Sequence, residues 1–282
     1  MSKESTNHEY KISVLLPTRG RSEALTRSLK SLFELASDTS SIELLLGFDN
    51  DDKKGLESFQ EITQPWLDSQ DISYTVMSFE PLGYSRLNEY VNTLASTSDS
   101  DWLIFWNDDA VMETENWDGI ISSYTGQFKL LAFHTHNDHP YSIFPIVPRA
   151  WLDTLGYLSP HQLSDGWLSQ QAYLLDIWER IPVNVTHDRY DLTGNNLDDT
   201  FKNRVMFEGN HTDPRDFHNK KQIDLRYQDC DRLAEYMKQQ GLNTSWWENV
   251  KNNKQDPWEK LKLVDVNKQM MQYNIDHTGS KK

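Results

Sequence analysis

Short apolar runs recur along the first two thirds of the chain and predict β-strands. Each run is bounded by turn-forming or charged residues and is too short for a helix. The predicted strands cover residues 12–16, 42–48, 74–79, 102–106 and 130–133. The run 102–106 consists of large apolar residues only, which is typical of a strand covered on both faces. A further strand over 182–185 begins with proline, and we therefore expect it at an edge of the sheet.

Amphipathic stretches between these runs predict helices. Ser22 is placed to cap the first helix, in which apolar residues share one face at helical spacing: Leu25, Leu29, Leu32 and Phe33. Further helices are predicted after Gly83, from Asn116, over 148–156, after Asp165, over 229–240 and over 257–273; residues 55–66 are helical or irregular. The order strand, helix, strand calls for a right-handed parallel crossover, the start of a nucleotide-binding α/β sheet.

Composition limits the partners and surroundings of the protein. The 282 residues include 43 acidic and 28 basic side chains, a formal net charge of -15. This charge argues against nucleic acid or an anionic membrane as the main partner. The N-terminal residues lack the apolar core of a signal peptide, no run is long enough to cross a bilayer, and Cys230 is the single cysteine. We therefore expect a cytoplasmic protein with no transmembrane segment.

Polar and charged residues directly follow three of the predicted strands. They are Pro17, Thr18, Arg19, Gly20 and Arg21 after the first strand, Asp49 to Asp52 after the second, and Asn107, Asp108 and Asp109 after the run 102–106. In an open α/β sheet, ligands bind outside the carboxyl ends of the strands, so these groups are expected to face one cleft. The first loop offers backbone N–H groups and a guanidinium for a phosphate. Asp49 offers an acceptor for a nucleoside.

The triplet that ends in Asp109 has two alternative explanations. Its carboxylate and amide oxygens are hard ligands suited to Mg²⁺ or Mn²⁺, and such an ion would neutralise a diphosphate. The same residue types also form solvated turns and helix caps that bind nothing. The common placement of the three polar clusters at strand ends favours the first explanation.

Four motifs together resemble the GT-A glycosyltransferases of the large inverting family that includes bacterial polysaccharide synthases (glycosyltransferase family 2-like). The motifs are the run 14–21, the strand ending in Asp49, the segment 83–88 and the triplet ending in Asp109. The resemblance implies an α/β fold with a Rossmann-like mixed sheet flanked by helices, here with a C-terminal helical extension. It also implies sugar transfer from a nucleotide sugar, usually a UDP-sugar, to a hydroxyl of a glycan or other acceptor, with Mn²⁺ or Mg²⁺ as cofactor.

The resemblance assigns donor binding to residues of all four motifs. Thr18 and Arg21 would line the nucleoside pocket, and Asp49 would accept a hydrogen bond from uracil. Arg86 would approach the ribose or the diphosphate. The complete set expected to bind the nucleotide sugar is Pro17, Thr18, Arg19, Arg21, Asp49, Asp51, Arg86, Asn107 and Asp108.

The resemblance also assigns the metal site. Asp108 and Asp109 match the metal-binding acids, with Asp109 expected to coordinate directly. Asn107 stands where the family commonly has another aspartate, so the ribose contact falls to either Asn107 or Asp108. His187 follows a predicted strand, where some GT-A enzymes supply a third ligand; it is either that ligand or a structural histidine. A denser cluster, for which an acceptor or metal role is conceivable, consists of His134, His136 and His139.

The expected catalytic base is Asp165. In inverting members a carboxylate downstream of the metal motif takes the proton of the acceptor hydroxyl. The family often has a Glu-Asp pair there, whereas this chain has Ser164 and Asp165. The alternative is that Asp165 only caps the helix that follows it.

The chain is expected to divide into three parts. Residues 1–10 form a disordered N-terminus, and 11–195 form the GT-A core, with a nucleotide-sugar half (11–109) and an acceptor half (110–195). Residues 196–282 form a helical extension that could also join copies of the chain. Two other functions stay open: a sugar-phosphate nucleotidyltransferase, disfavoured because the loop after the first strand has one glycine, and a non-catalytic nucleotide- or sugar-binding module.

Overall fold

The protein is described by a computed structural model that covers residues 10–135, 141–195, 198, 201–202, 217 and 219–252. Within these residues the strands form one eight-stranded sheet in the order β3-β2-β1-β4-β7-β6-β8-β5. The strands are β1 (Tyr10–Thr18), β2 (Ile42–Asp49), β3 (Ser73–Phe79), β4 (Ser100–Phe105), β5 (Ala110–Met112), β6 (Leu130–Thr135), β7 (Ile146–Pro148) and β8 (Trp178–His187). The strands predicted from these runs are thus confirmed, although β3 is only partly buried.

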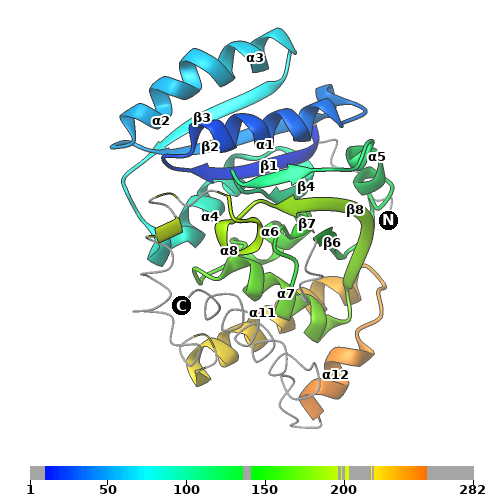
Figure 1. The fold of residues 1–282 in the computed structure, drawn as a ribbon. Helices are drawn as coiled ribbons and strands as arrows, with labels where there is room; N and C mark the ends of the chain where they lie inside the picture. Colours follow the sequence, from blue (N-terminus) through cyan, green and yellow to red (C-terminus); the bar gives the residue numbers. More distant parts are fainter. Residues whose placement is uncertain are drawn as a thin grey trace.

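Helices cover both faces of the sheet (Figure 1). One face carries α1 (Ser22–Glu34), the helical stretch α2 (Lys53–Ser58), η2 (Phe59–Thr63) and α3 (Gln64–Ser69), and α5 (Trp117–Ser122). The other face carries α4 (Leu87–Thr97), α6 (Arg149–Leu155) and α7 (Ser164–Leu175), with α11 (Lys220–Gln239) and α12 (Ser245–Asn252) packed outside them. Short helical turns are η1 (Thr39–Ser41), η3 (Tyr84–Arg86) and α8 (Tyr190–Thr193).

Alternation along the central strands divides the core into two layers. In β1, Val14 and Leu16 contribute to the cluster under α1, whereas Leu15 joins the cluster under α4 and α7. Successive side chains of a strand point to opposite faces, so a strand that is apolar at every position requires a cover on both sides. The sequence of β1 therefore dictates the three-layer arrangement.

The position of β4 beside β1 in the sheet marks where a ligand site is expected. β1 pairs in parallel with β2 on one side and with β4 on the other, and β4 pairs antiparallel with β7. The chain thus winds outward from β1 in one direction and returns to its other side, so the carboxyl ends of β1 and β4 lie side by side at a point where the strand order reverses. A ligand crevice is expected at the carboxyl ends of these two strands. The sheet is mixed, as the resemblance implied.

The predicted position of β8 was wrong. β8 lies between β6 and β5 and not at an edge of the sheet. Its proline interrupts the pairing with β6 locally, and the pairing resumes after it. The register with β6 shifts between Arg180 and Asn184, and Pro182, which has no N–H to donate, falls within this irregular part. The strand consequently continues to His187 and carries that residue into the interior of the sheet.

Two predicted helix caps were also wrong. Ser22 is the first residue of α1; its cap position is Arg21, and no side chain caps the helix. Asp165 lies within the first turn of α7, after Leu163 at the cap position. A carboxylate in a first turn is still favoured by the helix dipole.

The C-terminal part that the structure describes packs on the core through α11. This helix begins at Lys220, earlier than predicted, and buries Cys230, Leu233 and other apolar residues against α6 and α7. Asp229 is buried there and accepts hydrogen bonds from Tyr157 and Trp167, and also from Gln171. The helix predicted over 257–273, the N-terminal residues 1–9, and His136 and His139 lie outside the described residues. Over the described residues, no helix combines the length and the apolar character that crossing a bilayer requires.

Candidate donor and metal site

The carboxyl ends of β1 and β4 meet through a direct side-chain contact. The two strands are parallel neighbours, with Leu15 opposite Phe105. The hydroxyl of Thr18 at the end of β1 donates to Oδ2 of Asp108 at 2.8 Å. Both residues are buried. The sequence prediction that the first loop and the acid triplet face one another is confirmed.

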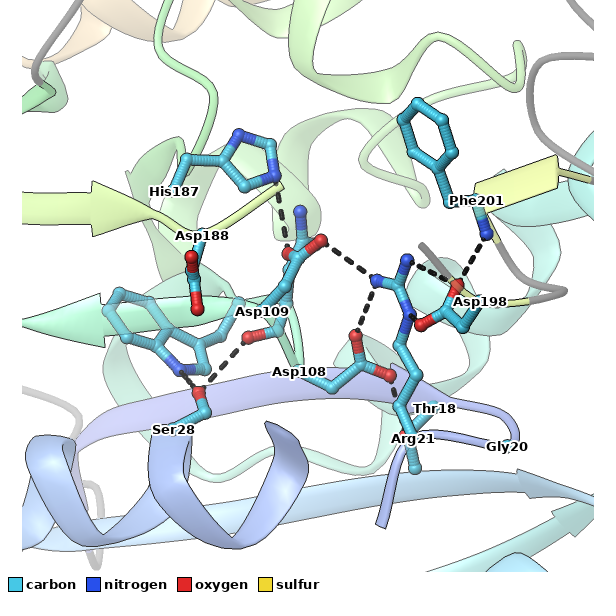
Figure 2. Close-up of polar contacts among 12 residues, drawn as sticks. Thr18, Gly20, Arg21, Ser28, Asp108, Asp109, His187, Asp188, Asp198 and Phe201 are labelled. Carbon is cyan, nitrogen blue, oxygen red and sulfur yellow. Dashed lines mark hydrogen bonds and ion pairs between the residues drawn. The ribbon is translucent and has the colours of Figure 1, made fainter. Parts of the chain in front are cut away.

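Helix α1 fixes the loop that carries the acids (Figure 2). The hydroxyl of Ser28 donates to the carbonyl of Asn107 at 3.1 Å and accepts from the indole of Trp106 at 2.8 Å. One turn later, Ser31 accepts from the backbone N–H of Met112. Buried polar groups whose hydrogen bonds are all formed make a loop rigid, so these contacts with α1 hold the carboxylates after β4 in place.

Arg21 neutralises the acids of the triplet. Its Nη1 lies 3.1 Å from Oδ1 of Asp108 and 2.8 Å from Oδ2 of Asp109. Its Nε and Nη2 donate to the two oxygens of Asp198, at 2.6 and 3.1 Å. The Arg21 side chain is 7% exposed, so the guanidinium is an almost buried counter-ion for three carboxylates.

His187 approaches Asp109 from the opposite side. β5 and β8 pair antiparallel with Ala110 opposite His187, which brings Nε2 of the histidine to 3.2 Å from Oδ1 of Asp109. The backbone N–H of Asp188 also donates to the carbonyl of Asp109 at 2.7 Å. The ring of His187 packs edge-on against Phe144, with 5.2 Å between the ring centroids. Sequence motifs separated along the chain thus converge on Asp109.

The two adjacent acids have opposite electrostatic surroundings. Burial raises the pKa of Asp108, and the negative charge of Asp109 raises it further, against the opposing effect of Arg21. Burial acts to raise the pKa of Asp109 too, but His187 and Arg21 outweigh it and hold that pKa below its usual range. Asp109 is therefore the carboxylate that stays ionised most firmly, as a cation ligand must.

The donor set of Asp109 and His187 fits a divalent cation. Oδ1 of Asp109 has the imidazole Nε2 of His187 as its only ion-pair neighbour among the described residues, and the other ring nitrogen, Nδ1, is buried without a hydrogen-bond partner there. Carboxylate oxygen together with imidazole nitrogen suits Mn²⁺. No group of three histidine, cysteine or acidic side chains in the described part of the chain could hold a metal ion alone. An ion here would complete its coordination with water oxygens, or with substrate phosphates when these are bound.

A second polar group lies at the end of β2. Nη1 of Arg19 contacts Oδ2 of Asp49 at 2.7 Å and also pairs with Asp51. The hydroxyl of Tyr90 donates to Oδ1 of Asp49 and accepts from the backbone N–H of Leu82 at 2.8 Å. Asp49 is 5% exposed, whereas Arg19 is about half exposed. The pair Asp49 and Arg19 therefore presents a fixed acceptor and an accessible cation at the carboxyl end of β2.

Other predicted site residues do not join these contacts. Arg86 is largely exposed and forms an ion pair with Glu89 on its own helix turn. Pro17 lies within β1 beside Gly47 of β2. Asp165 is half-buried on α7. Among the described residues, the hydrogen bonds and ion pairs given above for Arg21, Asp109 and His187 do not include it. The side chain of His134 is exposed on β6.

Three residues of the site were missed by the sequence reasoning. Tyr90 lies on α4, within the helix predicted after Gly83, and no site role was expected for it. Asp188 is buried and accepts from Arg27, Thr193 and Asn195, and Asp198 binds Arg21 from 177 positions away. No periodicity marks Asp188 or Asp198; the only signal is that acids follow the strand that ends at His187.

Comparison with known proteins shows which solved structures have a similar fold. No protein-family model matches the sequence, and no curated protein is significantly similar to it. The structure is similar to that of S. aureus TarS 1-349 in complex with UDP-GlcNAc, at 14% identity and a TM-score of 0.57, over 78% of this chain and 66% of that one. It is also similar to the mannosyltransferase PcManGT from Pyrobaculum calidifontis in complex with GDP-Man and Mn²⁺, at 10% identity and a TM-score of 0.55, over 96% of this chain and 87% of that one.

A further similar structure is S. aureus TarS 1-349 alone, at 12% identity and a TM-score of 0.52, over 78% of this chain and 80% of that chain. Identities this low establish the architecture and not the chemistry. The chain has the GT-A fold of nucleotide-sugar glycosyltransferases, and the fold expected from the resemblance is confirmed.

Proposed function

We propose that the protein is a metal-dependent glycosyltransferase that moves a sugar from a nucleotide sugar to a hydroxyl acceptor. The observation that carries the proposal is the convergence of Asp109, His187 and Arg21 at the carboxyl ends of β1 and β4. This is the place where an α/β sheet of this topology binds nucleotides. The UDP-GlcNAc and GDP-Man bound by the similar structures support a nucleotide-sugar donor.

The donor is proposed to be a UDP-sugar that lies along the ends of β2, β1 and β4. Asp49 would accept from the base, with Tyr90 and Arg19 fixing its carboxylate. Thr18 and Arg21 would face the ribose and the diphosphate. Residues at the borders of this path complete the proposed donor site: Pro17, Asp51, Arg86, Asn107 and Asp108.

Asp109 and His187 are proposed to hold Mn²⁺ or Mg²⁺. Such an ion would offset the negative charge of the departing nucleoside diphosphate. Before the ion binds, the contacts of Asp109 with His187 and Arg21 hold the pKa of this carboxyl low and so keep it ionised. Asp108 stays hydrogen-bonded to Thr18 and is better placed to support the loop or the ribose than to act as a second strong ligand.

Asp165 is proposed as the base of an inverting reaction. Its carboxylate would take the proton of the acceptor hydroxyl while that oxygen forms a bond to the anomeric carbon of the sugar. The bond from this carbon to the diphosphate breaks at the same time, on the opposite face. Asp165 lies in the first turn of α7, half-buried, in the half of the chain after Asp109.

The division of labour along the chain follows from these roles. We propose residues 11–109 as the nucleotide-sugar half, 110–195 as the acceptor half, and 196–282 as an extension that supports the acceptor half and could join copies of the chain. Location in the cytoplasm, where nucleotide sugars are made, is part of the same proposal.

The test is calorimetric titration of UDP with and without Mn²⁺, on the wild type, on Asp109→Ala and on a control, Asp224→Ala. Asp224 is a half-exposed acid on α11 that pairs with Lys220. We expect binding that needs both Mn²⁺ and Asp109, and turnover of a UDP-sugar that falls about a hundredfold or more in Asp109→Ala only, because a catalytic cation is worth several kcal/mol.

Each other outcome has a defined meaning. UDP binding that is indifferent to Mn²⁺ and to Asp109 would contradict the metal assignment. Saturable binding with no turnover of any UDP- or GDP-sugar would favour the non-catalytic module. No binding under any condition would refute the donor site.

A further inference from the structure

Arg21 is held through two separate edges of its guanidinium group (Figure 2). Nη1 contacts the acids after β4, Asp108 and Asp109, whereas Nε and Nη2 both donate to Asp198. Only the first edge faces the carboxylate proposed to bind the cation. The second edge is independent of it, because it uses different nitrogen atoms and a different acid.

A cation bound at Asp109 would compete with Arg21. A cation at Oδ1 of Asp109 and the guanidinium at Oδ2 would share one carboxylate and repel each other, so the cation weakens the contact of Arg21 with Asp109. The Arg21 side chain is only 7% exposed, and a guanidinium that loses its counter-ion at this depth is strongly destabilised. The bidentate contact with Asp198 remains available to a guanidinium that gives up Asp109.

We infer that Asp198 is a positioning residue of the cation site: it retains Arg21 while Asp109 exchanges the guanidinium for the divalent ion. This inference rests on the proposed function. Asp198 is well suited to the role because it is itself fixed in place. Its Oδ1 also accepts the backbone N–H of Phe201 at 2.7 Å, and the ring of Phe201 packs against Tyr190 at 5.4 Å between centroids.

The role predicts a specific dependence of cation affinity on Asp198. In Asp198→Asn a single carbonyl oxygen must serve both the N–H of Phe201 and Arg21, and it carries no charge. Arg21 then depends more on Asp109 and competes more strongly with the cation. The effect of Asp198 should therefore act through Arg21 and vanish when Arg21 is absent.

The experiment is a double-mutant cycle on the full chain, read out as Mn²⁺ affinity by calorimetry and by the electron paramagnetic resonance signal of free Mn²⁺, without donor. The variants are Asp198→Asn, Arg21→Gln and the double variant. Asp153→Asn is the matched control, because Asp153 pairs with an arginine, Arg149, on α6 and is exposed. Thermal unfolding verifies that each variant is folded.

We expect Asp198→Asn to raise the dissociation constant of Mn²⁺ about fivefold in the wild-type background, as for a lost charge-assisted contact. We expect a change of less than about twofold for Asp198→Asn in the Arg21→Gln background and for the control Asp153→Asn. An equal loss in both backgrounds would mean that Asp198 acts only as a distant charge, and this would overturn the inference. An unchanged affinity in Asp198→Asn would overturn it as well.

Failure of the proposed function gives a different result. If Mn²⁺ binds the wild type no better than Asp109→Ala, the metal site itself is refuted, and the role of Asp198 is refuted with it. If binding depends on Asp109 but the cycle shows no coupling, the metal site stands and only the inference fails.

Discussion

Replacement of Tyr90 by phenylalanine tests how the donor half holds its nucleoside acceptor. The change removes one hydroxyl and keeps the ring, which packs against Phe79 with 4.9 Å between centroids. The hydroxyl makes two contacts, donating to Asp49 and accepting from the backbone N–H of Leu82. Burial, together with the hydrogen bond to the charged Asp49, raises the pKa of Tyr90 to about 12, so the hydroxyl stays protonated as a donor at neutral pH.

The expected cost follows from the burial of both partners. Tyr90 is 6% exposed and Asp49 is 5% exposed, so water replaces the lost hydroxyl poorly. A hydrogen bond to a charged group is worth about 1.5–3 kcal/mol, and the N–H of Leu82 also loses its acceptor. We expect Tyr90→Phe to lower the free energy of unfolding by about 2 kcal/mol, which for a chain of this size is a fall in Tm of about 4 °C. Because Asp49 keeps Arg19 but loses its second anchor, we expect UDP affinity to fall about fivefold.

Thermal unfolding and calorimetric titration of UDP measure the two effects. Tyr74→Phe is the matched control: its hydroxyl also donates to an aspartate, Asp68, but at an exposed position. The control should change the unfolding free energy by less than about 0.5 kcal/mol and leave UDP affinity unchanged. If Tyr90→Phe behaves like the control in both assays, the argument that Tyr90 orders Asp49 for the nucleoside is refuted.

Two further predictions concern packing and charge. A Cβ at Gly47 would lie 2.9 Å from Cε2 of Phe79 and 3.6 Å from Cδ1 of Leu94. We therefore expect Gly47→Ala to lower the unfolding free energy, measured by chemical denaturation, by about 1–3 kcal/mol. An unchanged denaturation midpoint would contradict this prediction. Burial raises the pKa of Asp229 above its ordinary value of 3.8, against the hydrogen bonds it accepts, so this carboxyl stabilises the fold most below pH 3.8 and loses that contribution as the pH rises through its folded-state pKa. The Tm of Asp229→Asn relative to the wild type should therefore rise between about pH 4 and about pH 7, and a constant difference would refute the assignment.

Much of the fold could be predicted because burial dictates it locally. The strand 102–106 could be read from five large apolar residues in succession, and the helix after Ser22 from the spacing of Leu25, Leu29 and Leu32; all of these residues are buried. Helix ends were less predictable, because Ser22 and Asp165 are good capping residue types that the chain instead places inside a first turn. The order of the sheet beyond β4 depends on long-range pairing, which no local pattern encodes.

The parts of the site that lie at the ends of neighbouring parallel strands could be predicted from the sequence, and the other parts could not. Thr18 and Asp108 meet because β1 and β4 are adjacent and end at the same edge. His187 reaches Asp109 only through the antiparallel pairing of β8 with β5, which could not be derived from periodicity. Asp188 and Asp198 follow β8 in the sequence, and no periodicity marks them as part of the site.

The charge distribution of the site itself argues for a cation with the donor. Both arginines after β1 are already neutralised by carboxylates: Arg19 by Asp49 and Asp51, and Arg21 by Asp108, Asp109 and Asp198. The chain as a whole carries a formal net charge of -15. A nucleoside diphosphate that approached without a metal would meet excess negative charge and would have to separate an arginine from its acids. A divalent ion at Asp109 removes both obstacles, because it neutralises the acid pair and frees one edge of Arg21 for a phosphate oxygen. We therefore expect the ion to enter before the nucleotide or with it.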